Sequence, residues 1–582
     1  MLTIEALSYE YPQKDLFHKI SFTANPGEHC ALIGSSGTGK STLLQMILYP
    51  EEFLFDGKIL RESLTRPGYV SQFSDRNSEY DTSVFEFIAE YFLEIQLKID
   101  GVCESMQADE NTKDDKIIET LLEEYQNLFD QFQAVDGDNY ESNIRIKLNS
   151  AGLGQIAHQK MSTLSGGEYK LVQIIREMLT GPDLMLMDEP DVFLDFENLN
   201  SLKTLINGYQ GTMLVITHNQ FLLHHCFQKI LHIENKILHE FEGTLQEYQL
   251  ALLQYKLERQ ETAAADLAEA ERNAAIIERL RISATNLADP AKGKALKARV
   301  KLQERLLARM SEMPFIDIEQ PNICFPDSKV SAEQVLLTID DHKIAFDKIL
   351  FQNASLTLHA GEKVALIGEN GTGKTTLLRE IYANASEDIQ IDPDTKMAFL
   401  SQFQSDMLHE SNTVLEEFLL HGFERVNDVT DKLVDYHLNP ECLNQKITEL
   451  SGGEKNLLQL ALISVSPTNL LLLDEPTSHL DIYAQSALER AVRNYRGAIL
   501  MVSHDFYTIA SCADTVYIIE NGAMRSMSMR AFRKMIYSKY FDKDYLLTEQ
   551  KRSELTKQAE EALSSSQLAD AKLYVELLED LL

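Results

Sequence analysis

The chain has 582 residues, enough for about four domain-sized units, and its apolar and charged fractions are those of an ordinary globular protein. Its formal net charge of −36 excludes a surface that is basic throughout, so nucleic-acid binding would need a local basic patch. No apolar run approaches the roughly 20 residues that a membrane-spanning helix needs, so any transport channel would be another polypeptide. Six scattered cysteines, and an N-terminus without a basic region followed by an apolar run, predict a cytoplasmic protein without a signal peptide.

Two glycine-rich segments, residues 34–41 and 368–375, share one pattern. Each follows an apolar strand and opens a leucine-rich helix, which is the setting of a phosphate-binding loop. Backbone N–H groups of such a loop surround phosphate oxygens, the lysine neutralises them, and the Ser or Thr hydroxyl reaches Mg²⁺. The predicted nucleotide-binding residues of the first copy are Gly34, Ser35, Ser36, Gly37, Thr38, Gly39, Lys40, Ser41 and Thr42. Those of the second copy are Gly368, Glu369, Asn370, Gly371, Thr372, Gly373, Lys374, Thr375 and Thr376.

The spacing of the repeated motifs locates an insertion in the first copy. Gln72 and Gln402 are 330 residues apart, whereas every later motif repeats at 286, so the first copy carries 330 − 286 = 44 additional residues after Gln72. Apolar residues at helical spacing over 84–99 and 118–132 predict a helical hairpin with a loop over 104–116. Its 14 acids against 3 bases between residues 94 and 141 favour a basic protein partner or, equally, a purely solvated acidic surface.

Apolar strands that end in carboxylates supply the predicted catalytic centres, with Asp-Glu pairs at 188–189 and 474–475. At the carboxyl edge of a parallel sheet, such an aspartate suits Mg²⁺ and the glutamate is placed to polarise an attacking water. A histidine follows another apolar run in each copy, again 286 residues apart. The predicted catalytic residues are Glu189, Glu475, His218 and His504. The predicted metal ligands are Ser41, Gln72, Asp188, Thr375, Gln402 and Asp474.

Together with two LSGGE segments, these motifs resemble the ATP-binding cassette superfamily over about 480 residues. The resemblance implies an ATPase with ATP and Mg²⁺ as cofactors, in which two cassettes of one monomer face each other head to tail. It places each signature over the phosphate loop of the other cassette. The signature residues are Ser165, Gly166, Gly167 and Glu168, and Ser451, Gly452, Gly453 and Glu454. Tyr11 and Phe346 match the family's adenine-stacking aromatic, although a core position is an alternative for Phe346.

Two cassettes in one chain with a helical linker resemble the ABC-F family, whose members act on ribosomes. The second half keeps that family's pattern in residues 368–371 and 477–481. The first half departs from it, with Ser35-Ser36 in place of Glu-Asn and Asp191-Val192-Phe193-Leu194-Asp195 in place of a small-polar-His loop. Because that loop crosses the interface between the cassettes, we expect two unequal ATP sites.

The middle of the chain belongs to neither repeat. It predicts a long helix over about 246–284, a break at 289–293, and a return helix that packs back through a seam at Leu296, Val300, Gln303, Leu307 and Met310. Residues 245–271 have 6 acids and 2 bases, whereas residues 272–310 have 10 bases and 3 acids. Such a basic end suits RNA phosphates. The RNA-binding candidates are Arg279, Arg281, Lys292, Lys294, Lys297, Arg299 and Lys301.

These observations predict an α/β fold with two ATP-binding cassette domains, each a P-loop NTPase core with a helical subdomain, joined by a long helical-hairpin linker. The predicted borders are 1–244 with an insertion about 95–140, 245–313 for the linker, 314–544, and 545–582 for a C-terminal helix or hairpin. The family resemblance implies the ribosome as partner, with ribosomal and transfer RNA at the linker, in translation or in protection from antibiotics. The alternatives are a solvated spacer for the linker, and an ATPase subunit of a transporter with a separate permease.

Overall fold

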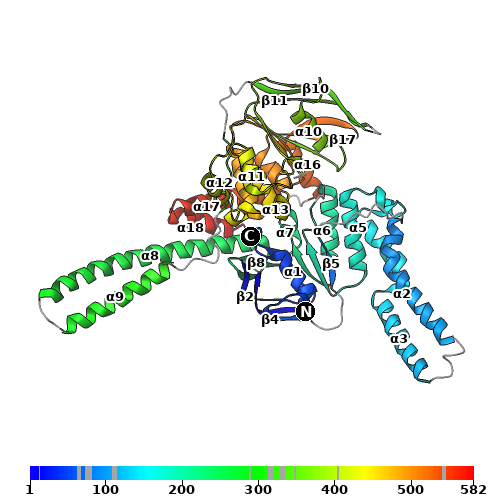
Figure 1. The fold of residues 1–582 in the computed structure, drawn as a ribbon, viewed down its shortest axis with the longest axis horizontal. Coiled ribbons are helices and arrows are strands. Elements are labelled where there is room, and N and C mark those ends of the chain that lie inside the picture. The colour runs from blue at the N-terminus through cyan, green and yellow to red at the C-terminus, as the bar shows by residue number, and fades with distance from the viewer. Residues whose placement is uncertain are drawn as a thin grey trace. The chain divides into compact units, whose positions relative to one another are not determined.

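The computed structural model describes residues 1–11, 14–61, 67–72, 82–107, 115–192, 194–286, 290–311, 320–326, 334–346, 349–402, 406–540 and 545–581. The chain forms two units. Both cassettes belong to the first, which comprises Met1–Glu242 and Gln320–Ile536. The second comprises Gly243–Glu319 and Tyr537–Leu582, so it combines the middle segment with the C-terminus. Figure 1 colours these segments by residue number.

The first cassette is built around a mostly parallel sheet. Its strand order among the described residues is β5 (Gly68–Val70), β6 (Leu184–Asp188), β7 (Thr212–Ile216), β3 (His29–Ile33), β8 (Lys229–Glu234) and β9 (Ile237–Glu242). A separate antiparallel sheet contains β2 (Lys14–Ala24), β1 (Leu2–Tyr11) and β4 (Asp56–Arg61). The side chains of β3, β6, β7 and β8 are nearly all buried, which explains why these strands are continuous apolar runs.

The second cassette repeats this strand order. Its described strands run β14 (Met397–Leu400), β15 (Leu470–Asp474), β16 (Ala498–Val502), β12 (Lys363–Gly368), β17 (Thr515–Glu520) and β18 (Ala523–Ser528). Here the antiparallel strands β11 (Ile349–His359), β10 (Val335–Ala345) and β13 (Ile389–Ile391) continue the same sheet. The shared order confirms the predicted α/β fold class and the internal repeat.

Helices cover both sheets. The first cassette contributes α1 (Lys40–Leu48), α5 (Gly166–Leu179), α6 (Phe196–Asn207) and α7 (Gln220–His225). Their counterparts in the second cassette are α10 (Lys374–Ala383), α13 (Gly452–Ile463), α14 (Ile482–Asn494) and α15 (Phe506–Cys512), and α16 (Met529–Tyr540) follows β18.

The insertion in the first cassette consists of α3 (Asp115–Ala134) and most of α2 (Val84–Gln107), which precede α4 (Tyr140–Ser150). The corresponding helices of the second cassette, α11 (Val414–Leu420) and α12 (Val426–Asp435), are short and have no α3 counterpart between them. The expected loop over 104–116 was too long, because α2 continues to Gln107 and α3 already begins at Asp115. The remainder of that loop, 108–114, lies outside the described residues.

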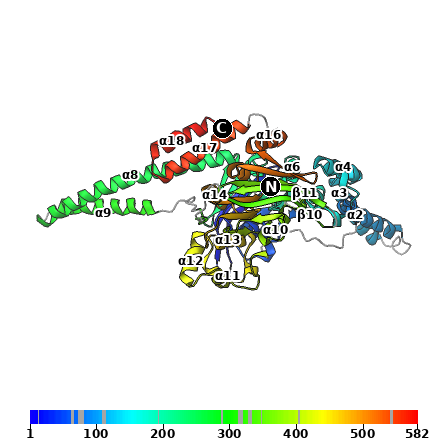
Figure 2. The ribbon, with the colours of Figure 1, turned by 90° about the horizontal axis from the view of Figure 1, so that it is seen from above.

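The second unit contains α8 (Leu245–Asn286) and α9 (Pro290–Ser311), which lie side by side in both views (Figures 1 and 2). The break predicted at 289–293 was wrong for residues 290–293, which begin α9. Pro290 occupies the first helical position, where its missing N–H costs no hydrogen bond. Within the seam, Asn273 is 1% exposed, and its Nδ2 donates to the Arg299 carbonyl and to Gln303 Oε1, both at 2.9 Å.

The C-terminal helices α17 (Tyr545–Ser564) and α18 (Leu568–Glu579) form a hairpin that packs on α8 (Figure 2). Their shared apolar core contains Leu250, Leu253 and Leu257 of α8. The hairpin contributes Ala559, Ala562, Leu563, Ala571, Val575 and Leu578 to that core. A C-terminal hairpin was one of the two expected forms, but its attachment to α8 was not predicted.

Candidate functional site

The two phosphate loops adopt the same conformation in both cassettes. Lys40 Nζ donates to the carbonyls of Gly34 and Ser35 at 2.9 Å each, and Lys374 Nζ makes the equivalent bonds at 2.8 Å. Both lysines are more than nine-tenths buried, and burial lowers the pKa of each. They lie at the N-termini of α1 and α10, where backbone N–H groups and a lysine together favour a phosphate.

A glycine is required directly before each of these lysines. Gly39 and Gly373 have φ of 91° and 96°, in the left-handed region that other residues rarely adopt. A Cβ at Gly39 would also come within 2.9 Å of the Phe17 ring. The loops can therefore reverse direction against the apolar core only with glycine at these positions.

Acidic residues follow the buried strands β6 and β15 at the edge that faces the phosphate loops. Burial raises the pKa of Asp188 and of Asp474 to about 6 each. Both oxygens of Asp474 are buried and make no hydrogen bond of good geometry to a described residue. Thr375, Gln402 and Asp474 line one cavity, and each offers an oxygen ligand. A cation bound there would compensate the charge of the buried Asp474 carboxylate. This donor set fits Mg²⁺.

That cavity, of about 730 Å³, is lined by residues of both cassettes. Gly166, from the signature of the first cassette, and Lys374, from the phosphate loop of the second, both line it. In the opposite pairing the two segments are in close contact, because a Cβ placed on Gly453 would lie 3.0 Å from Ser36 Oγ. Each signature thus lies near the phosphate loop of the other cassette, as the head-to-tail arrangement requires.

Two further contacts cross the interface in a matching way. Ser36 N donates to Asp481 Oδ2 at 2.9 Å, and Asn370 N donates to Asp195 Oδ2 at 3.4 Å. Asp481 and Asp195 also cap α14 and α6, respectively. The loop of each cassette that ends in this aspartate therefore contacts the phosphate loop of the other.

The signature sequences have a local structural role as well. Ser165 and Ser451 are the N-caps of α5 and α13, and each forms a capping box with the glutamate three residues later. Glu168 and Glu454 therefore bind their own helix N-terminus, which fixes the glycines between them. That they also bind nucleotide stays a prediction.

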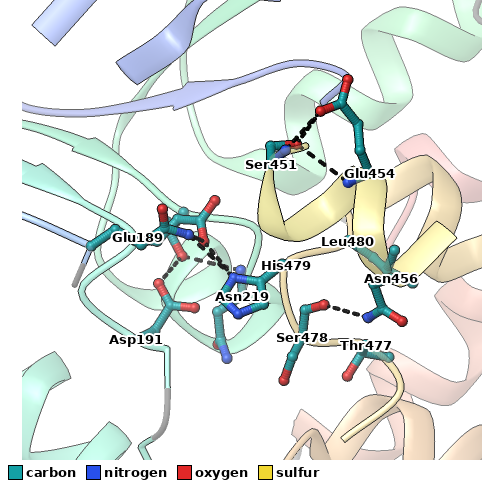
Figure 3. Close-up of polar contacts among 12 residues, drawn as sticks. Glu189, Asp191, Asn219, Ser451, Glu454, Asn456, Thr477, Ser478, His479 and Leu480 are labelled. Carbon is teal, nitrogen blue, oxygen red and sulfur yellow. Dashed lines mark hydrogen bonds and ion pairs between the residues drawn. The ribbon is translucent and has the colours of Figure 1, made fainter. Parts of the chain in front are cut away.

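The two candidate bases are held differently. Glu189 Oε2 accepts from Gln72 Nε2 at 2.6 Å and lies 3.4 Å from His479 Nδ1 of the second cassette (Figure 3). Burial would raise the pKa of Glu189, but the hydrogen bond with His479 and nearby positive charges lower it to about 2. Among the described residues, no side chain of the opposite cassette hydrogen-bonds to Glu475, and burial followed by the charge of Asp474 raises its pKa.

The predicted catalytic histidines, His218 and His504, lie beside these bases. His504 Nε2 is 3.7 Å from Glu475 Oε1, and burial lowers the pKa of His504 to about 3. Phe196 of the first cassette contacts the His504 ring edge-on, with the ring centroids 6.0 Å apart. Burial also lowers the pKa of His218. Burial therefore favours the neutral form of both imidazoles, in which one ring nitrogen can accept a hydrogen bond.

Three contacts of the first site were missed by sequence reasoning. Glu234 Oε2 accepts from the backbone N of Ser35 at 3.1 Å and from its hydroxyl at 2.8 Å. Lys170 donates to the carbonyls of Ser71 and Gln72, which anchors the segment that carries the predicted metal ligand Gln72. His479 was noted only as part of a family pattern. Each contact joins residues about 100 to 300 positions apart, so no local signal reveals it.

The candidate adenine-stacking residues have different outcomes. Phe346 is 70% exposed, so the alternative of a core aromatic is wrong, and stacking on adenine stays a prediction. Tyr11 ends β1, and its side chain lies outside the described residues.

The RNA-binding candidates lie in the second unit, on α8 and α9. The candidates exposed to solvent are Arg279, Arg281, Lys294, Lys297, Arg299 and Lys301, whereas the side chain of Lys292 lies outside the described residues. Arg299 Nη1 also donates to Asn273 Oδ1 at 3.3 Å, which gives this arginine a role in the helix seam.

Comparisons with known proteins agree with this architecture. A family model described as ABC transporter matches residues 17–192 and 351–478. The ABC transporter F family member 2 of Arabidopsis thaliana is 28% identical over 90% of this chain and 76% of its own length. The uncharacterized ABC transporter ATP-binding protein YfmM of Bacillus subtilis is 27% identical over 87% of this chain and 96% of its own length.

Solved structures share the fold at lower identity. An RNase-L inhibitor superimposes with a TM-score of 0.55 at 18% identity, covering 92% of this chain and 93% of its own. The archaeal ribosome recycling factor aABCE1, solved with the ribosomal stalk protein aP1, has a TM-score of 0.53 at 17% identity and covers 92% of each chain. In the part of the chain that the structure describes, no helix is both long and apolar enough to cross a membrane.

Proposed function

Because this chain belongs to the ABC transporter family, lies within its ABC-F group and is an ATPase, we propose that it binds the ribosome with ATP between its cassettes and leaves after hydrolysis. The cytoplasm is the compartment that this function requires. The second unit supplies the RNA contact, and the first supplies the ATP-dependent change.

The basic surface of the α8–α9 hairpin carries this proposal. In a chain of net charge −36, Lys294, Lys297 and Lys301 all project into solvent from one short stretch of α9. Basic side chains in a row on a helix gain affinity by releasing counterions from a phosphate backbone. Among the described contacts, none of these three lysines forms an ion pair within the protein. Ribosomal RNA and transfer RNA are the partners that such a surface fits.

ATP would act by holding the two cassettes together. Lys40 and Lys374 bind the phosphates of two nucleotides, and each signature closes on the nucleotide of the other cassette. Mg²⁺, held by Ser41, Gln72 and Asp188 or by Thr375, Gln402 and Asp474, would neutralise charge on the phosphates. Glu189 and Glu475 orient the attacking water, and hydrolysis removes the γ-phosphate that joins the two halves.

The acidic hairpin of α2 and α3 provides a second candidate contact. Leu97 and Leu122 are 70% and 53% exposed on it, beside many carboxylates. Exposed leucines among acids fit a partner that is basic with apolar side chains, so we propose a basic ribosomal protein here. Its binding should weaken as salt rises.

Co-sedimentation tests the proposal. A Glu189→Gln/Glu475→Gln variant should bind ATP without hydrolysing it and should migrate with ribosomes in a sucrose gradient that contains ATP. The same variant without nucleotide should remain at the top of the gradient. Absence from the ribosomal fractions in both gradients would discard ribosome binding and favour a transporter subunit.

Two roles fit this activity, a translation factor and a factor that protects ribosomes from antibiotics. The long acidic insertion and the modest linker favour the translation factor. Drug susceptibility of cells with and without the gene separates them. Unchanged susceptibility together with a growth or polysome defect supports the translation role, whereas a drug-specific loss of resistance supports protection.

A further inference from the structure

The candidate base of the first cassette is held by a side chain of the second. His479 Nδ1 lies 3.4 Å from Glu189 Oε2, and Gln72 Nε2 donates to the same oxygen at 2.6 Å. In Figure 3 the His479 ring points at the Glu189 carboxylate from the loop that follows β15. The His479 and Glu189 side chains are 10% and 16% exposed, so water competes little for this contact.

The backbone that presents His479 is strained and firmly anchored. His479 has φ of 61°, in the left-handed region, which persists in a non-glycine residue only when its surroundings enforce it. Asn456 Nδ2 donates to the Ser478 carbonyl at 2.7 Å, and Gln485 Nε2 donates to the Leu480 carbonyl at 3.0 Å. Asn456 and Gln485 are both buried. The second cassette therefore fixes the backbone from which the His479 ring extends.

The same loop is docked on the phosphate loop of the first cassette. Asp481, two residues after His479, accepts from Ser36 N at 2.9 Å, and its other oxygen caps α14. Displacement of this loop would therefore remove the histidine from Glu189 and the aspartate from Ser36 together. Support of the base is coupled in this way to the contact between the cassettes.

The second site lacks an equivalent histidine. At the repeat offset of 286, His479 corresponds to Phe193, which lies outside the described residues and whose phenyl ring has no hydrogen-bond donor. Glu475 Oε2 accepts from His504 N at 3.2 Å, whereas Glu475 Oε1 meets no hydrogen-bond partner among the described residues. The two bases thus differ in their support from the opposite cassette.

We propose that His479 is a positioning residue that acts across the interface, orienting Glu189 for hydrolysis of the ATP bound at Lys40. The proposal rests on the ATPase role of Glu189. In that step the water oxygen bonds to the γ-phosphorus and the bond to the bridging oxygen breaks, with its electron pair leaving on ADP. The proton of the water passes to Glu189. Gln72 Nε2 also lies 3.2 Å from His479 Nδ1, so the three groups form one cluster. In the tautomer that carries the proton on Nδ1, His479 and Gln72 both donate to Oε2, and the carboxylate presents its other oxygen to the water.

Hydrolysis at the first site can be measured alone in a Glu475→Gln background. There His479→Phe, which copies the residue of the other cassette, should lower kcat about tenfold, the usual effect of losing a hydrogen bond to a charged group. The KM for ATP should stay within about twofold, because Lys40 is held by the carbonyls of Gly34 and Ser35, which the substitution leaves in place. His479→Asn should retain more of the rate than His479→Phe, since its amide can replace Nδ1 and asparagine tolerates the left-handed backbone.

Tyr483→Phe is the matched control. It removes another hydrogen bond between the cassettes, the one that joins the Tyr483 hydroxyl and His232 Nε2 at 3.2 Å, and leaves Glu189 unchanged. Its kcat should stay within about twofold. The loss caused by His479→Phe should also be larger in the Glu475→Gln background than in the Glu189→Gln background, where only the second site can turn over.

Several results would overturn the inference. Equal losses in both backgrounds, an equal loss for Tyr483→Phe, or an unchanged kcat for His479→Phe would each remove the positioning role. A Glu475→Gln variant no faster than the double glutamine variant would show that the first site is inactive and would also overturn it. Ribosome co-sedimentation of the double variant does not depend on hydrolysis, so failure of this inference is distinguishable from failure of the proposed function.

Discussion

Glu489 of α14 is a buried carboxylic acid outside the ATP sites. It accepts from the hydroxyls of Thr508 at 3.2 Å and Ser511 at 3.1 Å. Burial, followed by the charge of Asp505, raises its pKa to about 7. Burial therefore shifts Glu489 toward its protonated form, although the charge of Arg493 and the two hydroxyl hydrogen bonds act in the opposite direction.

This residue predicts a pH-dependent stability of the second cassette. The folded pKa of Glu489 lies above the unfolded value, so the stability that this group contributes is full below pH 4.5 and is lost as pH rises through about 7. The total loss from this group is roughly 3 kcal/mol. Glu489→Gln should remove that part of the dependence and raise the melting temperature at pH 8 but not at pH 5. Thermal unfolding at both values measures it, and an equal change at both would contradict it.

Motif residues were predictable because each motif is a continuous segment whose chemistry determines its spacing. The phosphate loops, the Asp-Glu pairs and the signatures were all found in this way. The contact of His479 with Glu189 was not, because it joins residues 290 positions apart across an interface. Phe193, which stands where the other cassette has a histidine, led us to predict two unequal sites. Only the structure shows that the histidine of the second cassette lies beside the candidate base of the first site.

The second unit shows which helical features the sequence predicts and which it does not. The bounds of α8 were predicted closely, at about 246–284 against Leu245–Asn286. The apolar seam predicted the return helix α9, but Pro290 was misplaced because proline favours both breaks and first helical positions. The attachment of α17 and α18 to α8 was not predictable. Its core joins Leu253 to residues some 300 positions later, and alanines and leucines alone do not specify a partner.

The core between α8 and the C-terminal hairpin should be sensitive to one truncation. Leu253 is 4% exposed, so Leu253→Ala should cost about 2–5 kcal/mol of local stability. Amide hydrogen exchange in α17 and α18 should then accelerate by roughly tenfold or more. Leu267→Ala on the same helix is the control, because Leu267 is 49% exposed. Unchanged exchange in the Leu253 variant would show that this core does not hold the hairpin.

The acidic insertion and the exposed basic helices belong to different units of the molecule. The ATP sites and the acidic α2–α3 hairpin lie in one unit, and the exposed bases of α8 and α9 lie in the other. A net charge of −36 would repel RNA over most of the surface, so productive contact requires the basic hairpin. We therefore expect ribosome binding to depend on a few lysines of α9, whose substitution should leave both ATP sites unchanged.

Charge reversal on α9 tests this assignment most directly. Lys294→Glu, Lys297→Glu and Lys301→Glu are combined in the Glu189→Gln/Glu475→Gln background, leaving Arg299 and its seam bond intact. The control reverses Lys551, Lys557 and Lys572, three exposed lysines of the C-terminal hairpin, for the same change in net charge.

The measurement is co-sedimentation with ribosomes in ATP, with nucleotide binding measured in parallel. The α9 variant should lose ribosome affinity by at least about tenfold and keep ATP binding, since each lost phosphate contact weakens association. The control should co-sediment like the parent. Equal co-sedimentation of the α9 variant and its parent would contradict the account and make this hairpin a spacer.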